Sequence, residues 1–449
     1  MHPVIHRLNK IYVSDIDFWT DTRIEGSKLL IHAKDLIKRL MNDPEIGPYA
    51  NDIKLDIAHP GESVRIIPVK DVIEPRLSMI PGYQCFPGVF YKWNPDEKTV
   101  PSGEIFALSG AVVTTVGPIV AYQEGLIDMS GPGADYTVFS KKIHLVLDIA
   151  VKEEITPHEH EKTVRMAGLK TADYLAKTAI TPETGWGSCE NFENPLPKIN
   201  DACPKKCHSC SCQSIPKIAY LYMLQSQGLL HDTYYCGIDA KTMLPRLMTP
   251  SEIMFGALIS GNCVSACDKN TTYHHQNNPI IYELLRRHHI DWEFVGCVLT
   301  NENVTREDKE KNSTLAAELI ASLKPDGVII SPEGFGNPAV DLMKCCAKIE
   351  EKGIKTVLLI DEFPGQDGTS PSLVFTHSSA NAVVSTGNAN EIVNLPPMAK
   401  IIGDCSVLQR LAGGSDKSLL PDGSIEVEIQ VITGATNQMG FGKLSAEVR

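Results

Sequence analysis

The sequence has no long apolar run. None of its hydrophobic stretches approaches the roughly 18 apolar residues that a membrane-spanning helix needs. The N-terminal residues, Met1 to Leu8, also lack the apolar core and the small-residue cleavage site of a signal peptide. We therefore expect a cytoplasmic protein without a membrane partner.

An excess of basic charge is missing as well. The 449 residues include 42 lysines and arginines against 55 aspartates and glutamates, which gives a formal net charge of -13. Nucleic-acid affinity depends on clustered Lys and Arg that neutralise phosphates, so we expect no nucleic-acid partner. With 43% hydrophobic and 22% charged residues, the composition is typical of a soluble globular protein, and the length predicts two or more domains.

Cysteine, by contrast, is plentiful, with 13 residues in the chain. In a reducing cytoplasm these thiols are expected in the core, at metals or in reactive sites before disulfides. Four of them lie in an irregular insert over residues 178–214, namely Cys203, Cys207, Cys210 and Cys212. Together with His208 they offer the ligand types of a structural zinc or iron–sulfur site. Because the spacing fits no paired zinc knuckle, a thiol-rich loop without metal is the alternative.

The pattern of apolar residues divides the chain into three parts. Residues 1–155 contain short β-branched runs separated by Gly and Pro, which predicts a β-rich domain. Residues 156–404 contain short apolar runs and helical stretches in alternation, which predicts a doubly wound α/β domain with a parallel sheet. In residues 405–449, alternating apolar and charged positions predict a strand that either returns to the β-rich domain or meets another subunit.

Capping residues indicate where several helices begin. Thr156 is followed by Pro157 and Glu159, which is the pattern of a capping box with proline at the first helical position. Further helix starts are expected at Asn278, Thr305 and Asn337.

Polar residues follow the predicted parallel strands. In an open parallel sheet, ligands bind beyond the carboxyl ends of the strands. The side chains that follow the apolar runs are therefore candidate substrate-binding residues: Glu302, Glu333, Asn337, Asp361 and Asn388. Each of them could instead cap a helix or form a turn, which is the more common role of such residues.

The stretch over residues 260–270 is unusual in its chemistry. Gly261 gives the backbone the freedom to hold the Asn262 carbonyl against the thiol of Cys263. Attack by that thiol would be an N-to-S acyl shift. If β-elimination and hydrolysis follow, the chain is cleaved after Asn262 and residue 263 becomes a pyruvoyl group. Such a ketone is an electron sink that can capture an amine substrate as a Schiff base.

Two adjacent histidines lie shortly after this stretch. His274 and His275 offer an acid and a base near neutral pH, so either could activate the thiol or protonate the departing nitrogen. For each histidine taken alone, a structural or surface role is as open as a catalytic one.

Several long blocks of the sequence resemble one enzyme family. They include PGESVRIIPVKDVIEPR, QEGLIDMSGPGADYTVFS, RMAGLK, YMLQSQGLLHDTY and PEGFGNP, together with residues 260–270 and 425–444. On these blocks, the chain resembles the proprotein subunit of component B of the glycine, sarcosine and betaine reductases. The cysteine cluster departs from the usual pattern of that family. The resemblance implies that the chain is cleaved between Asn262 and Cys263 and that Cys263 becomes the pyruvoyl cofactor.

The resemblance also implies the substrate class and the partners. The pyruvoyl subunit would hold the amine of a glycine-type substrate for attack by the selenol of a separate, selenocysteine-bearing subunit of component B. Selenoprotein A and component C of the reductase would be further partners, and a disulfide or thioredoxin would be the redox partner that exchanges electrons with the complex. Glycine and sarcosine can form a Schiff base with a ketone, whereas the quaternary nitrogen of betaine cannot.

Two other functions stay open at this point. A proline reductase uses a pyruvoyl precursor with the same cleavage logic. A metal-binding structural or assembly protein would instead have the cysteine cluster as its functional centre, and its Asn262–Cys263 bond would be an ordinary peptide bond.

Overall fold

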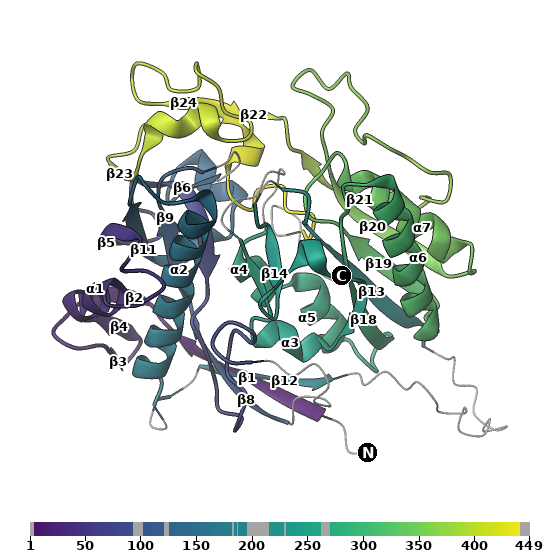
Figure 1. Cartoon of the computed structure of the whole chain (residues 1–449), viewed down its shortest axis with the longest axis horizontal. Helices are drawn as coiled ribbons and strands as arrows, with labels where there is room; N and C mark the ends of the chain where they lie inside the picture. The colour runs from purple at the N-terminus through teal and green to yellow at the C-terminus, as the bar shows by residue number, and fades with distance from the viewer. Residues whose placement is uncertain are drawn as a thin grey trace.

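The computed structural model describes residues 4–92, 102–120, 125–181, 184–185, 187–194, 215–228, 230–261 and 270–440. Within these ranges a β-rich part and an α/β part lie side by side (Figure 1). The predicted fold class, a β-rich domain followed by a doubly wound α/β domain, is confirmed.

The main sheet of the β-rich part is covered by the longest helix among the described elements. Its strands run in the order β10 (Gly125–Asp128), β6 (Val64–Ile73), β9 (Ala111–Val116), β11 (Ile143–Val151) and β5 (Ala50–Ala58), with β23 (Lys400–Gly403) also paired to β6. Helix α2 (Pro157–Ala179) buries Val164, Leu169 and Leu175 against this sheet. The helix begins at the predicted capping box, in which Thr156 and Glu159 each accept a hydrogen bond from the backbone of the other.

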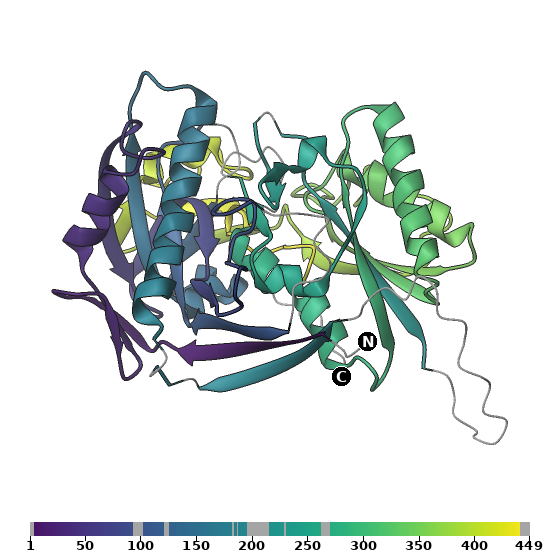
Figure 2. The same cartoon turned by 60° about the horizontal axis from the view of Figure 1, so that its bottom comes forward.

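Two smaller sheets extend the β-rich part. The first has the order β12 (Ser188–Asn194), β1 (Val4–Tyr12), β8 (Gly103–Ser109) and β7 (Arg76–Ser78), and the second has the order β2 (Asp15–Phe18), β4 (Lys28–Ile31) and β3 (Arg23–Glu25) before helix α1 (Ala33–Met41). In Figure 2, β1 and β12 run side by side beneath the molecule. Helix α2 and strand β12 pack with the β-rich part, and the division of the chain at 155/156 stays a prediction.

The α/β part is built on a six-stranded sheet. Its order is β16 (Arg246–Met248), β18 (Glu293–Asn301), β13 (Lys217–Leu224), β19 (Gly327–Ser331), β20 (Lys355–Glu362) and β21 (Val383–Asn388). All neighbours are parallel apart from β16 and β18. The chain places β18 on one side of β13 and β19 on the other, which makes the carboxyl end of β13 a topological switch point.

The central strand β13 is buried on both faces from Ala219 to Leu224. Along β13, Tyr220 and Tyr222 face a cluster that includes helix α5 (Pro279–Arg286), whereas Leu221 and Met223 face the opposite cluster. That second cluster contains apolar residues of α6 (Arg306–Ser322) and α7 (Pro338–Glu350), which pack on each other. Burial on both faces explains why β13 reads as a continuous apolar run.

The predicted starts of these helices are also found. The Asn278 side chain accepts a hydrogen bond at the start of α5, and the Thr305 side chain does so at the start of α6. Helix α7 begins after Asn337, whose side chain makes no capping bond.

Short elements connect β13 to β18 and carry the chain toward the switch point. They are β14 (Thr233–Tyr235), β15 (Ile238–Asp239), α3 (Pro250–Met254), β17 (Leu258–Ser260) and α4 (Thr272–Gln276). Short 3-10 helices complete the described elements: Pro132–Tyr136, Phe139–Lys141, Ala240–Thr242, Cys405–Arg410 and Ile429–Val431.

The C-terminal residues return to the β-rich part, which was one of the two predicted alternatives. Strands β22 (Ile392–Leu395) and β24 (Ile425–Glu428) pair with each other, and the Thr433 backbone donates to the Leu126 carbonyl at 2.9 Å. Figure 1 shows the end of this yellow segment passing into the middle of the molecule, between the two parts.

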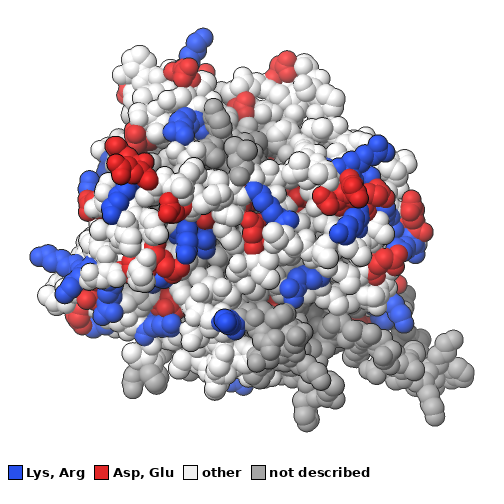
Figure 3. All heavy atoms as spheres, viewed as in Figure 1, with Lys and Arg blue, Asp and Glu red and all other residues white. Residues whose placement is uncertain are grey.

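Acidic and basic side chains are interspersed on the molecular face viewed in Figure 3. Among the surface ion pairs, Lys344 of α7 lies 2.6 Å from Glu310 of α6. Within the described ranges, no helix has the length and apolar character that crossing a membrane requires.

Candidate active site

The carboxyl ends of three neighbouring strands bring two buried glutamates together. Glu302 follows β18, Glu333 follows β19, and Gln225 follows β13, which lies between them. The Glu333 backbone N–H donates to Oε1 of Glu302 at 2.9 Å, and the Gln225 backbone N–H donates to Oε2 of Glu333 at 2.6 Å. When the Gln225 side-chain amide is oriented so that both its oxygen and its nitrogen can form hydrogen bonds, the nitrogen donates to Oε2 of Glu302 at 2.5 Å. The structure thus assembles the two predicted glutamates at the switch point.

Burial dominates the protonation of both glutamates. It raises the pKa of Glu302 well above its ordinary value, and the nearby Glu333 charge raises it further. Burial also raises the pKa of Glu333 to about 7, although the Gln225 N–H and the Thr233 hydroxyl, 2.9 Å away, oppose the rise by bonding its carboxylate. Glu333 therefore exchanges its proton near neutral pH, as a general acid or base must.

His275 connects Glu333 to a buried tyrosine. Its Nδ1 lies 2.7 Å from the Tyr222 hydroxyl, and its Nε2 lies 3.3 Å from Oε1 of Glu333. Burial lowers the pKa of His275 to about 3 and raises the pKa of Tyr222 well above its ordinary value. Both groups are consequently neutral at pH 7, so the hydroxyl donates to Nδ1 and the ring proton on Nε2 faces Glu333.

His274 has a different environment from its neighbour. Its Nδ1 accepts from the Thr271 backbone N–H at 3.0 Å, and its own backbone N–H donates to the Thr271 hydroxyl, so this side chain closes a capping box on α4. Burial lowers its pKa to about 3. On the other side, a side chain at Gly434 would bring its Cβ to 2.9 Å from Nε2, so the C-terminal segment passes close to the ring. A structural role accounts for these contacts, and a catalytic role for His274 stays a prediction.

The other predicted site residues, Asn337, Asp361 and Asn388, lie at or after the carboxyl ends of β19, β20 and β21. Asn388 closes a turn by accepting from the Asn390 backbone at 2.9 Å, and Asn337 is exposed at the start of α7. Asp361 is buried at the carboxyl end of β20. A substrate-binding role for these three residues remains a prediction.

The predicted cleavage residues, Asn262 and Cys263, lie outside the described residues, but the chain on both sides is described. Asn270 is the first described residue after them, and its amide donates to the Tyr222 hydroxyl at 3.3 Å. The Asn437 amide in turn donates to Asn270. The histidine–glutamate group and the C-terminal segment therefore meet at the end of this stretch.

The predicted metal ligands Cys203, Cys207, Cys210 and Cys212 also lie outside the described ranges. Within those ranges, no group of three or more His, Cys, Asp or Glu side chains is arranged to hold a metal ion. Zinc or iron–sulfur binding by the cluster therefore stays a prediction without support from the structure.

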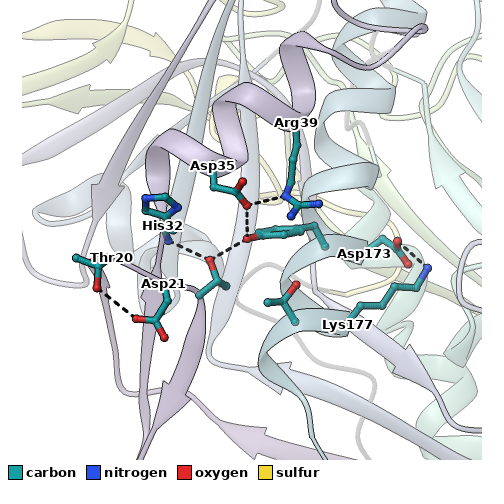
Figure 4. Close-up of a pocket in the computed structure, with 10 residues that line it drawn as sticks. Thr20, Asp21, His32, Asp35, Arg39, Asp173 and Lys177 are labelled. Carbon is teal, nitrogen blue, oxygen red and sulfur yellow. Dashed lines mark hydrogen bonds and ion pairs between the residues drawn. The ribbon is translucent and has the colours of Figure 1, made fainter.

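A surface pocket of about 580 Å³ lies elsewhere, between α1 and α2 (Figure 4). Its cationic residues are already paired, because Arg39 lies 2.6 Å from Asp35 and Lys177 lies 2.9 Å from Asp173. The pocket is on the β-rich part, away from the carboxyl ends of the parallel strands, so we place the candidate site at the switch point.

Sequence reasoning did not identify Tyr222 and Asn437 as site residues. Tyr222 is one position in an apolar strand, where an aromatic side chain is expected to pack in the core. Asn437 is distant in sequence from Asn270, and nothing in its local pattern predicts that contact. Only the folded chain brings them together.

Comparison with known proteins identifies relatives over the whole chain. The profile of the family described as glycine/sarcosine/betaine reductase component B subunits matches residues 5–447. The chain is 47% identical to the glycine reductase complex component B subunits alpha and beta of Acetoanaerobium sticklandii, over 98% of this chain and 99% of that protein. It is 43% identical to the sarcosine reductase complex component B subunit alpha of Peptoclostridium acidaminophilum, over 98% of each chain.

A more distant similarity covers a shorter region. The D-proline reductase proprotein PrdA of Acetoanaerobium sticklandii is 20% identical over 31% of this chain and 24% of that protein. No solved structure matches the chain.

Proposed function

The chain belongs to the family of glycine/sarcosine/betaine reductase component B subunits, and we propose that it is the pyruvoyl-bearing subunit of such a reductase. In this proposal the chain cleaves itself between Asn262 and Cys263, and residue 263 becomes the ketone that receives the amine of a glycine-type substrate. The observation that carries the proposal is the buried Tyr222–His275–Glu333 group, which adjoins Asn270 at the end of the cleavage stretch.

The proposed cleavage balances without an external oxidant or reductant. The Cys263 sulfur attacks the Asn262 carbonyl carbon, the amide C–N bond breaks, and the nitrogen takes up a proton. Loss of the Cα proton and of the Cβ–S bond then releases the Asn262 thiocarboxylate and leaves an enamine at residue 263. Water replaces the nitrogen, which leaves as ammonia, and the thiocarboxylate hydrolyses to a carboxylate and hydrogen sulfide.

The described residues fit a site for amine chemistry. A pyruvoyl ketone supplies an electrophilic carbonyl that takes up the substrate amine as a Schiff base and withdraws electrons from the Cα–N bond. The amino group of an amino acid is protonated at neutral pH, and this ammonium group must lose a proton before its nitrogen can attack a carbonyl. Glu333, with its pKa raised to about 7 by burial, is suited to accept that proton, and Nε2 of His275 lies 3.3 Å from its carboxyl.

The substrate class follows from the same chemistry. Glycine and sarcosine carry amines that can condense with a ketone, whereas the quaternary nitrogen of betaine cannot. The relatives named for glycine and sarcosine are 47% and 43% identical to this chain. We therefore propose a primary or secondary amino acid of the glycine type as substrate.

The partners belong to the proposal as well. The sequence contains no selenocysteine, so the selenolate must come from another chain. We propose that a separate selenocysteine-bearing subunit of component B displaces the amine, and that selenoprotein A and component C complete the reduction, with a disulfide or thioredoxin on the electron side. The whole sequence would thus act in the cytoplasm as one part of a complex.

A trapping experiment tests this function. Purified protein is incubated with isotopically labelled glycine and then reduced with borohydride, and the fragments are separated under denaturing conditions. The proposal predicts covalent label on the fragment 263–449, and no label when the protein is treated with hydroxylamine before glycine is added, because hydroxylamine converts the ketone to an oxime. Label on the fragment 1–262 would place the carbonyl elsewhere and overturn the proposal.

A further inference from the structure

The two ends of the cleavage stretch are joined by one threonine side chain. The Ser260 backbone N–H, at the end of β17, donates to the Thr272 hydroxyl at 3.0 Å. That hydroxyl donates in turn to Oδ2 of Asp71 at 2.6 Å, and the Thr272 backbone N–H donates to Oδ1 of Asp71 at 2.8 Å. All three residues are buried. Ser260 and Thr272, twelve residues apart in the chain, are therefore held side by side, and Asp71 of β6 in the β-rich part fixes the Thr272 hydroxyl that joins them.

The upstream end is fixed a second time. The Gly261 backbone N–H donates to the Asp232 carbonyl at 2.6 Å, and the Ser260 hydroxyl donates to the Gly261 carbonyl at 3.0 Å. A Cβ at Gly261 would lie 2.2 Å from the His231 carbonyl oxygen, so only glycine fits this close approach. The backbone is thus held firmly up to the residue before Asn262.

The downstream end is fixed by helix α4. Thr271 and His274 form its capping box, and Asn270 bonds Tyr222 and Asn437. The helix therefore begins immediately at Thr272, and its first backbone N–H is directed to Asp71.

We propose that Asp71 and Thr272 are positioning residues for the self-cleavage of this chain, acting as a clamp that sets the separation and orientation of the two ends of residues 262–269. This inference rests on the proposed function, since it concerns the rate of that cleavage. An intrachain acyl shift depends on how well the thiol and the carbonyl are aligned, and alignment in turn depends on rigid flanking anchors.

The clamp also joins the two fragments that cleavage produces. Asp71 and Ser260 belong to residues 1–262, and Thr272 belongs to residues 263–449. The same hydrogen bonds would therefore hold Ser260 of the first fragment to Thr272 of the second after the bond is broken. A buried bond to a carboxylate is stronger than one between neutral groups, which suits this role.

The test follows conversion of newly synthesised full-length chain into the two fragments by denaturing gel and mass spectrometry. Thr272→Val keeps the shape of the side chain but removes both hydroxyl bonds, and we expect conversion to slow by ~10-fold or more. Thr272→Ser restores the hydroxyl and is expected to convert within about threefold of the wild-type rate. Asp71→Asn loses the acceptor for the Thr272 hydroxyl and should be slow like the valine variant.

A matched control separates positioning from general destabilisation. Thr356 is buried on β20 and bonds Glu350 at 2.8 Å, far along the chain from the clamp. Thr356→Val removes a comparable hydroxyl, and we expect a similar fall in thermal stability with an unchanged conversion rate. Should Thr272→Val fail to fold, Asp71→Asn and Thr272→Ser still give the comparison.

Different results would overturn the clamp and the self-cleavage itself. If the Thr272→Val and Asp71→Asn chains convert at the wild-type rate, the clamp is overturned while self-cleavage stands. Equal slowing by Thr356→Val would also overturn it. If the wild-type chain itself is never converted, the proposed function fails instead.

Discussion

The Tyr222 hydroxyl lies 2.7 Å from Nδ1 of His275, and both groups are completely buried. This contact fixes the imidazole tautomer, because the neutral tyrosine donates to Nδ1 and leaves the ring proton on Nε2. The separation of 3.3 Å between Nε2 and Glu333 is longer than a charge-assisted hydrogen bond.

Removing this hydroxyl tests the function of the group. Tyr222→Phe leaves His275 and Asn270 without their shared partner, which costs about 1–3 kcal/mol for each unsatisfied group. We expect substrate turnover to fall by roughly 10- to 100-fold at a nearly unchanged KM. Turnover is measured in the reconstituted reductase with its partner components.

Tyr220→Phe is the matched control. Tyr220 stacks on Tyr222 at a ring separation of 5.5 Å, is equally buried, and bonds Ser331 at 2.6 Å. Its loss should weaken folding to a similar degree with little change in turnover. Equal losses of turnover in the two variants would mean that the Tyr222 hydroxyl has only a structural role.

Glu333 should make the stability of the chain depend on pH. Its pKa is raised to about 7 in the folded protein, so the folded state holds this proton more tightly than the unfolded state does. The resulting stabilisation is complete below the ordinary pKa of a glutamate and is lost as the pH rises through 7. Between pH 5.5 and pH 8 the loss is on the order of 2 kcal/mol, and it should vanish in Glu333→Gln.

This prediction is measured by urea unfolding of the uncleaved Cys263→Ala chain at both pH values. Glu310→Gln is the control, because its two lysine partners lower the pKa of Glu310 to about 2 and it stays ionised throughout. If Glu333→Gln and Glu310→Gln shift the unfolding midpoint with the same pH dependence, Glu333 does not titrate near neutrality.

The two fragments should remain one particle after cleavage. In the six-stranded sheet, β13 of residues 1–262 lies between β18 and β19 of residues 263–449. Strand β23 of the second fragment also pairs with β6 of the first. Separation would break both sheets, so we expect a single peak in native size-exclusion chromatography and two fragments only in denaturant. Dissociation at neutral pH without denaturant would contradict this arrangement.

The chemistry at residue 263 predicts an order among variants. Alanine has no nucleophile, so Cys263→Ala should leave the chain uncut. Serine keeps a nucleophile, but a hydroxyl is far less acidic than a thiol with its reference pKa of about 8.5, and Cys263→Ser should cleave slowly and in part. Both routes lead to the same enamine, so substrate trapping should follow the cut fraction. Cleavage of Cys263→Ala at the wild-type rate would point to an external protease.

The sequence was informative where one local pattern determines the structure. The apolar runs placed the parallel strands, and because parallel strands all end at the same edge, they also predicted that Glu302 and Glu333 would lie close together. The same reasoning included Asn388, whose side chain accepts a hydrogen bond in a turn and whose substrate-binding role stays a prediction, since a polar residue after a strand has the same appearance in either role.

The remaining site residues could not be predicted because they depend on distant contacts. Asp71 lies in a strand of another sheet, and its bonds to Thr272 bridge about two hundred residues of chain. Asn437 reaches Asn270 only after the C-terminal segment has crossed the β-rich part. The two adjacent histidines were recognised, but their division into a capping residue and a partner of Tyr222 needed the geometry of α4.

Self-cleavage between Asn262 and Cys263 is decided by the intact mass of the purified, active protein under denaturing conditions. We expect two chains that correspond to residues 1–262 and 263–449, and the second should lack a free amino terminus because residue 263 would be a pyruvoyl group. A single chain of 449 residues in a fully active preparation would rule out self-cleavage.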